Sequence, residues 1–261
     1  MEGEYLDVTT QVGCPVNCLK YCPQEVTVNR YSGIRRFTVE NWRLVLSHLP
    51  RRLPICFSGI CEPFANPKTM DLIDMAEEAG HPLAIYTTLY QASKEDVERL
   101  VKHSFLTFVL HLPDGEAMKV PLSEEYKDNV FTVIQKVKNV EFCVMNDLFV
   151  SGNRENVTRG IPAKKKVLKL CSRLSNPNFN VLPDGDVSLC PIDFGLCNIV
   201  GNLFTESYGD IRKRFWSKRR SFDLCSTCYY NKPLIRYAFK YVGDRVRKPM
   251  FHIKERRIKN L

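Results

Sequence analysis

The sequence lacks any apolar run of about 18 residues, the length from which a helix becomes a candidate to span a bilayer. It also lacks a readable signal or transit peptide, because residues 1–4 are acidic and lead directly into a β-rich run. Internal repeats, low-complexity segments and long disordered stretches are absent as well. We therefore expect a globular protein of the cytoplasm that makes no contact with a membrane.

What the sequence does contain is cysteine and positive charge. Eleven cysteines in a chain without a secretion signal favour metal ligation over disulfides, because reducing compartments keep thiols free. The formal net charge of +9 favours anionic partners. These include a phosphorylated or nucleotide-bearing small molecule and nucleic acid, and charge alone does not choose between them.

Residues 6–145 alternate short β-rich runs with amphipathic stretches, which predicts an α/β fold with a parallel sheet. Thr38 and Ser93 are predicted to begin helices, and Gly80 to end one. Five such units are too few for a closed eight-stranded barrel. The predicted strands are 6–12, 54–58, 83–87, 105–112 and 140–144, and the predicted helices are 38–49, 69–79, 93–102 and 124–138.

The first motif is a cluster of three cysteines, Cys14, Cys18 and Cys22, spaced C-x3-C-x3-C directly after the first predicted strand. Three thiolates on one loop can hold three irons of a [4Fe-4S] cluster and leave the fourth iron open. A structural zinc site would require four closed ligands. A cysteine-rich zinc loop or a redox-inert loop remains the alternative interpretation of this motif.

The second motif, residues 57–67, lies at the end of the second predicted strand. It contains Gly59, Cys61 and Glu62, and Pro63 follows directly. Parallel-sheet folds place ligand-binding groups where strands end. Further polar residues at later strand ends are Thr87 with Thr88, His111 with Asp114, and Asn146. The alternative for the second motif is a proline-rich turn with a solvated Glu62.

The third motif lies beyond residue 165 and consists of Cys171, a β-hairpin over 179–189 that leads to Cys190, a Gly201-Asn202 turn, and Cys225 with Cys228. A short amphipathic helix is predicted over 211–217. Four cysteines that include a terminal C-x2-C suit one closed metal site, either zinc or an iron–sulfur cluster. Cys197 is a spare thiol that could replace one of the four.

Together the three motifs resemble radical S-adenosylmethionine (SAM) enzymes that carry a C-terminal SPASM/twitch-type domain. The resemblance implies a partial (β/α)6-type barrel over 1–165, a small β-hairpin and helix iron–sulfur domain over 166–235, and a basic tail over 236–261. It also implies two [4Fe-4S] clusters. Cys14, Cys18 and Cys22 would hold the SAM-binding cluster, and Cys171, Cys190, Cys225 and Cys228 the auxiliary one.

The resemblance assigns SAM itself to a second set of residues. Residues 59–62 are similar to the family's Gly-x-Gly-Glu-Pro element, which holds the methionyl ammonium, and Thr87 ends a neighbouring strand. Arg159, in an element that resembles the family's Ser-Arg type, would pair with the SAM carboxylate; the alternative is a surface arginine. Two departures stand out, namely one extra residue between Cys18 and Cys22, and Cys61 in place of a glycine.

The function implied by the resemblance is reductive cleavage of SAM and hydrogen abstraction by the 5′-deoxyadenosyl radical. The layout is similar to the twitch-containing aminocyclitol dehydrogenase, which predicts two-electron oxidation of a small anionic or sugar-like substrate. The auxiliary cluster would then accept an electron, and a flavodoxin or ferredoxin would donate one. No residue for the proton-accepting base can be named from the sequence.

Two other functions stay open at this point. The first is radical modification of a peptide or of nucleic acid, in which the tail, with nine Lys or Arg residues after position 235, would contact a polyanion. The second is a zinc-stabilised binding module without enzymatic activity. Metal analysis separates this module from the enzyme, because it predicts zinc without iron or sulfide.

Overall fold

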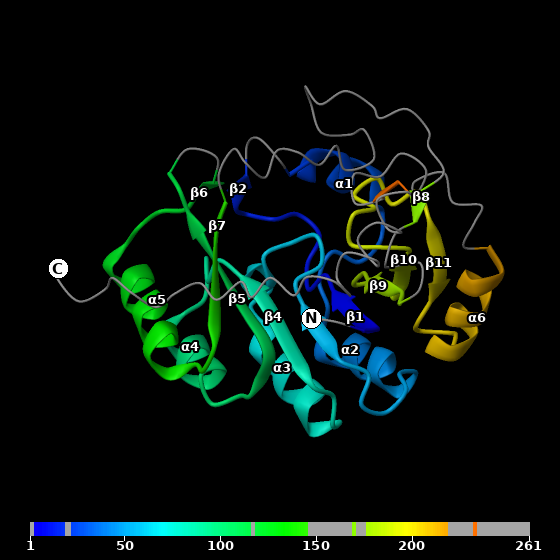
Figure 1. The fold of residues 1–261 in the computed structure, drawn as a ribbon, viewed down its shortest axis with the longest axis horizontal. Coiled ribbons are helices and arrows are strands. Elements are labelled where there is room, and N and C mark those ends of the chain that lie inside the picture. Colours follow the sequence, from blue (N-terminus) through cyan, green and yellow to red (C-terminus); the bar gives the residue numbers. More distant parts are fainter. Residues whose placement is uncertain are drawn as a thin grey trace, which may run out of the picture.

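The computed structural model describes residues 3–18, 22–115, 118–145, 169–170, 176–218 and 232–233. Its centre is an eight-stranded sheet with the strand order β11-β10-β9-β1-β3-β4-β5-β7, in which every neighbouring pair is hydrogen-bonded (Figure 1). The sheet does not close on itself within these residues. The α/β architecture with an open, mainly parallel sheet is the one that the sequence predicts.

The parallel half of the sheet contains the five predicted strands. The first ends at Val8, four residues before its predicted end, and the bounds of the others differ from the prediction by at most one residue. Residues 83–87 form β4 with unchanged bounds. The complete set is β1 (Tyr5–Val8), β3 (Ile55–Phe57), β4 (Leu83–Thr87), β5 (Phe105–Pro113) and β7 (Val140–Met145), each parallel to its neighbours in this series. The side chains of β1, β3 and β4 are mostly apolar and buried, which is the composition expected of a covered parallel sheet.

Four predicted helices cover one face of these strands in a row (Figure 1). Thr38 caps the first by accepting a hydrogen bond from the backbone N–H of Asn41, and Ser93 opens the third with a complete capping box. Gly80, with φ of +82°, follows the second, as predicted. The helices are α2 (Val39–Ser47), α3 (Thr69–Glu78), α4 (Lys94–Leu100) and α5 (Glu124–Lys136).

The predicted hairpin continues the same sheet at its other end. The strands β9 (Asn178–Val181) and β10 (Asp186–Ser188) pair antiparallel, and β10 pairs with β11 (Ile199–Asn202). β9 also pairs in parallel with β1, and α6 (Tyr208–Lys218) packs on β11. The hairpin of the predicted second domain therefore shares a sheet with the first. The predicted boundary at residues 165/166 lies outside the described residues.

Several short elements have no clear sequence signal. They are α1 (Gln24–Arg30), the 3-10 helix η1 (Pro63–Ala65), β2 (Asn17–Cys18), which pairs with β6 (Met118–Lys119), and β8 (Lys169–Leu170), which pairs with β12 (Lys232–Pro233). α1 has only seven residues and its N-cap, Pro23, makes no side-chain cap. An element of this kind is fixed by tertiary contacts rather than by its own periodicity.

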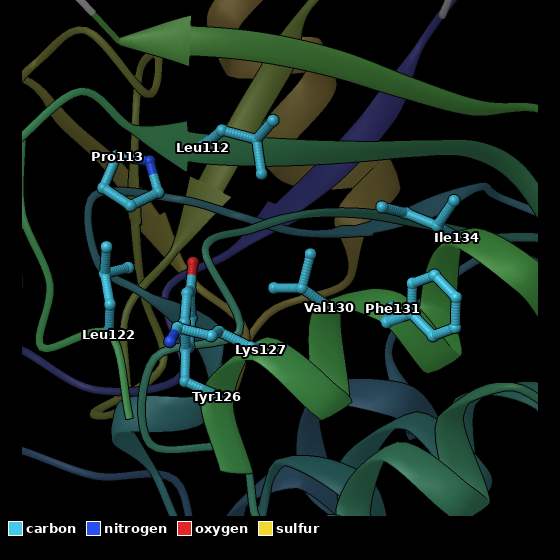
Figure 2. A pocket seen from close by; sticks show the side chains of 8 residues that line it. All are labelled: Leu112, Pro113, Leu122, Tyr126, Lys127, Val130, Phe131 and Ile134. Carbon is cyan, nitrogen blue, oxygen red and sulfur yellow. The ribbon is translucent and has the colours of Figure 1, made fainter. Parts of the chain in front are cut away.

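The main core lies between the helices and the sheet. Its largest fully buried side chains include Trp42, Phe57, Phe108 and Phe179. Farther along, an apolar groove runs between β5 and α5, with Leu112 and Pro113 on one side and Val130 and Ile134 on the other (Figure 2). Among the described residues, every helix is too short or too polar to cross a bilayer.

Candidate cofactor site

The candidate site lies where β1, β3 and β4 end. Parallel strands bring their carboxyl ends to one edge of the sheet, so the loops that follow these three strands meet there. The loop after β1 is held on both sides. Its backbone at Thr10 accepts a hydrogen bond from the N–H of Phe37 (3.1 Å), and Cys18 pairs with Met118 across the β2–β6 ladder.

The sulfur of Cys14 faces the loop after β3. It accepts a hydrogen bond from the backbone N–H of Glu62 (3.3 Å), and it lies beside the thiol of Cys61, which donates to the carbonyl oxygen of Glu62 (3.4 Å). The Cys61 thiol and the backbone N–H groups lower the pKa of the Cys14 thiol. A metal-binding cysteine is bound as the thiolate, and hydrogen-bond donors beside its sulfur favour that form.

The sulfur of Cys22 lies beside the first residue of α1. The side-chain amide of Gln24 donates to Cys22 Sγ (3.5 Å) and to the carbonyl oxygen of Ile60, and its oxygen accepts from the backbone N–H of Cys14 (3.2 Å). The N–H of Cys22 donates to the carbonyl of Cys18 (3.4 Å). The first and third cysteines are thus tied to one side chain.

Glycine is the only residue type that fits at position 59. Its φ is +54°, and a Cβ atom built there would lie 2.2 Å from Thr9 Oγ1 and 2.8 Å from Asn180 Oδ1. These two side chains are bonded to each other, because Thr9 Oγ1 donates to Asn180 Oδ1 (2.7 Å) and accepts from the N–H of Ile60 (3.1 Å). The loop after β3 therefore lies directly against Thr9, the residue after β1, and against the hairpin strand β9.

Cys61 keeps an ordinary backbone although it stands where a glycine was expected. Its φ is outside the left-handed region. Its side chain is buried, and the neighbouring Cys14 sulfur together with burial raises the pKa of the Cys61 thiol. Cys61 is therefore a neutral thiol in contact with the first cysteine of the loop.

Glu62 is buried, so the alternative of a solvated Glu62 in a turn is wrong. Its carboxylate accepts hydrogen bonds from the Thr87 hydroxyl, from the N–H and hydroxyl of Thr88 (both 2.7 Å), and from the N–H of Phe64 (3.4 Å). Burial nevertheless raises the pKa of Glu62. Four donors fill the acceptor capacity of a carboxylate. A ligand ammonium would have to displace a threonine hydroxyl or bind backbone oxygens.

His111 lies on the opposite face of the sheet from α2–α5, because its neighbour Leu110 belongs to the helix-covered core. The ring of Tyr86 approaches it edge-on at 6.1 Å between centroids. Burial lowers the pKa of His111 to about 4, so the imidazole is neutral at pH 7. Asp114, by contrast, accepts from the N–H of Met118 (3.0 Å) and is a turn residue.

Cys190 lies two residues after the end of β10. The N–H of Leu189 donates to the carbonyl of Asn198 (2.9 Å), so the residue before Cys190 lies beside the residue after Cys197. Cys197 is exposed, and its sulfur accepts from the guanidinium of Arg30 (3.0 Å). The other predicted site residues, Asn146, Arg159, Cys171, Cys225 and Cys228, lie outside the described residues.

In the part of the chain that the structure describes, no three His, Cys, Asp or Glu side chains converge closely enough to hold one metal ion. A [4Fe-4S] cluster makes a different demand, because each cysteine binds a different iron. Cys14, Cys18 and Cys22 are half-buried on one loop, and two of their sulfurs already accept N–H hydrogen bonds. These donors suit cluster thiolates.

The sequence matches no protein-family model and no curated protein. Three radical SAM enzymes are similar in structure. BtrN, in complex with AdoMet and 2-DOIA, has 18% identity and a TM-score of 0.65 over 87% of this chain and 93% of that chain. The chain has the radical SAM fold. SuiB of Streptococcus suis, bound to the precursor peptide SuiA, has 14% identity and a TM-score of 0.54 over 87% and 70% of the two chains.

The third radical SAM structure is anSMEcpe with bound AdoMet, with 12% identity and a TM-score of 0.52 over 87% of this chain and 88% of that chain. The fold therefore confirms the α/β partial-barrel prediction and the layout similar to BtrN, a twitch radical SAM aminocyclitol dehydrogenase. Identities of this size concern the fold alone. The cofactor assignments of Gly59, Cys61, Glu62, Thr87 and the cysteines stay predictions.

Proposed function

We propose that this protein is a radical SAM oxidoreductase that oxidises a small anionic or sugar-like substrate. Cys14, Cys18 and Cys22 would hold a [4Fe-4S] cluster beside SAM. Cys171, Cys190, Cys225 and Cys228 would hold an auxiliary [4Fe-4S] cluster that accepts an electron from the substrate. A flavodoxin or ferredoxin would supply the electron that starts each turnover.

One observation carries this proposal. The sulfur of Cys14 lies 3.3 Å from the N–H of Glu62, so the three-cysteine loop is in contact with the loop after β3 in a radical SAM fold. Cys14 and Glu62 are 48 residues apart in the chain. Their contact joins a cluster-type loop to the loop that the resemblance assigns to SAM.

When bound, a [4Fe-4S] cluster with one open iron supplies the electron that cleaves the sulfonium of SAM to methionine and a 5′-deoxyadenosyl radical. The chain's own residues do the positioning. Backbone and side-chain N–H groups from Glu62 and Gln24 stabilise thiolates at Cys14 and Cys22. The carboxylate of Glu62, anchored by Thr87 and Thr88, fixes the loop on which SAM would rest.

The likeness to BtrN supports a small-molecule substrate, because that enzyme's structure contains 2-DOIA. SuiB, bound to a precursor peptide, supports the second candidate, which is modification of a peptide. Burial lowers the pKa of His111 to about 4, which makes its imidazole a weak base at pH 7, so the proposal names no proton acceptor. The basic tail and its polyanion partner fall outside the described residues.

The test begins with iron, sulfide and zinc content of anaerobically reconstituted protein, beside a variant with Cys14, Cys18 and Cys22 changed to alanine. Incubation with SAM and dithionite then follows, with detection of 5′-deoxyadenosine. We expect about eight irons in the parent and about four in the variant, because each cluster holds four. 5′-Deoxyadenosine should form with the parent alone.

Two results would refute the proposal. Zinc without iron or sulfide would indicate the zinc-stabilised binding module. If the triple variant holds as much iron as the parent, the first site holds no cluster. An aminocyclitol and a peptide, each supplied with SAM, then separate the two substrate classes. Faster formation of 5′-deoxyadenosine with the peptide alone would favour the second candidate.

A further inference from the structure

Gln24 contacts three segments of the candidate site with a single side chain. Its oxygen accepts from the N–H of Cys14 (3.2 Å), and its nitrogen donates to Cys22 Sγ (3.5 Å) and to the carbonyl oxygen of Ile60. The partners fix the orientation of the amide, since an oxygen must face the Cys14 N–H and a nitrogen must face the Ile60 oxygen. Both hydrogens of the nitrogen are in use.

The position of Gln24 on α1 makes this bridge rigid. Gln24 is the first residue of the helix, and the next turn is anchored by Thr27, whose hydroxyl donates to the carbonyl of Phe194 (2.7 Å) and is fully buried. The helix therefore packs against the loop beyond the hairpin. A half-buried amide at the start of an anchored helix loses little additional freedom when it bonds.

We infer that Gln24 is a positioning residue that sets the spacing of the first and third cluster cysteines against the loop after β3 and donates a hydrogen bond to the Cys22 thiolate. The inference rests on the proposed function. Gln24 links Cys14 to Cys22 in addition to the backbone hydrogen bond that ties Cys22 to Cys18.

A donor to a cluster sulfur has two measurable consequences. It stabilises the more negative, reduced state of the cluster, so its removal lowers the reduction potential. It also orients the ligand, and loss of such partners typically weakens metal retention by about 10–100-fold. A residue that only stabilised the fold would change the melting temperature and leave the potential unaltered.

The test uses the full-length protein and two substitutions. Gln24→Met keeps the length of the side chain and removes all three hydrogen bonds without adding charge. Gln24→Glu keeps an acceptor for the Cys14 N–H and replaces the donor to Cys22 by a carboxylate oxygen. The matched control is Gln11→Glu, because Gln11 is also half-buried and bonds to the same loop at Gly13 (3.0 Å) and to Arg36.

Three quantities are measured on reconstituted protein. The first is iron held at the first site, defined as the iron that the triple cysteine variant loses. The second is the rate at which a chelator removes this iron, and the third is the midpoint potential of the electron paramagnetic resonance signal that changes when SAM is added. Circular dichroism melting reports on the fold of each variant.

We expect Gln24→Met and Gln24→Glu to release first-site iron about tenfold faster than the parent, and to titrate at a lower potential. Gln11→Glu should match the parent in both. If Gln24→Glu does not fold, Gln24→Met alone decides. Release at the parental rate with an unchanged potential would overturn the inference and leave the proposed function intact. A parent that holds no more iron than the triple variant would refute the proposed function itself.

Discussion

Replacing Gly59 with alanine should destabilise the protein through a clash that the structure locates atom by atom. The added Cβ would lie 2.2 Å from Thr9 Oγ1, 2.8 Å from Asn180 Oδ1 and 2.8 Å from Thr9 Cα. The last atom belongs to the backbone of Thr9, directly after β1, so a rotamer change cannot relieve the overlap. The backbone at Thr9 or the loop after β3 must move, and this movement would disturb the Thr9–Asn180 hydrogen bond.

The cost has two parts. A φ of +54° with a Cβ costs about 1–2 kcal/mol in the left-handed region. Overpacking a tightly filled site adds about 1–3 kcal/mol. The sum, about 2–5 kcal/mol, is a large share of the stability of a typical domain, about 5–15 kcal/mol.

Gly80→Ala is the matched control, because Gly80 has φ of +82° and no atom within 4 Å of an added Cβ. The free energy of unfolding of this variant should fall by the backbone cost alone, about 1–2 kcal/mol. The assay is urea unfolding of the cluster-free proteins followed by circular dichroism. Equal losses in free energy of unfolding for the two variants would refute the steric argument. Thr9→Ala in the Gly59→Ala background should restore part of the loss, since it removes the 2.2 Å contact.

Three further predictions use the same preparations. The folded pKa of His111, about 4, is below its unfolded value of 6.5, so the unfolded state binds the proton first as pH falls and stability is lost from pH 6.5 downward. At pH 5 this loss is about 2 kcal/mol, and His111→Gln should remove it; an unchanged difference in urea stability between pH 7 and pH 5 would contradict the argument. Asn180→Ala leaves the buried Thr9 hydroxyl without its acceptor and should lower the free energy of unfolding by about 1–3 kcal/mol in the same assay. A decrease below about 0.5 kcal/mol, which is typical of surface substitutions, would show that the Thr9–Asn180 pair contributes little. Cys190→Ser should lose about four irons and Cys197→Ser none, and the reverse result would make Cys197 the ligand.

Much of the fold could be predicted because its signals are local. The alternation of β-rich and amphipathic runs predicted five strands and four helices, and side-chain caps at Thr38 and Ser93 fixed where two of the helices begin. Two β-rich runs on either side of Pro183-Asp184-Gly185 predicted the hairpin over 179–189. A period of two or 3.6 residues and a capping box are complete within about ten residues of chain, so they can be recognised without the rest of the molecule.

The site could be predicted only in part. The spacing of Cys14, Cys18 and Cys22 indicated a cluster loop, and Glu62 was recognised by its neighbours in sequence. The environment of Glu62 was not, because its donors Thr87 and Thr88 come from the next strand. Nothing about Gln24, which directly follows a proline, marks it as a partner of both Cys22 and Ile60.

The sequence by itself therefore determined which elements form and which residue types gather near the strand ends. Tertiary structure decided which of them touch. β9 pairs with β1, so Asn180 reaches Thr9 across 171 positions of chain, and this contact in turn makes Gly59 obligatory. The physical reason is that a hydrogen bond or a steric contact depends on distance in space. Sequence spacing reports that distance only within a single helix, strand or turn.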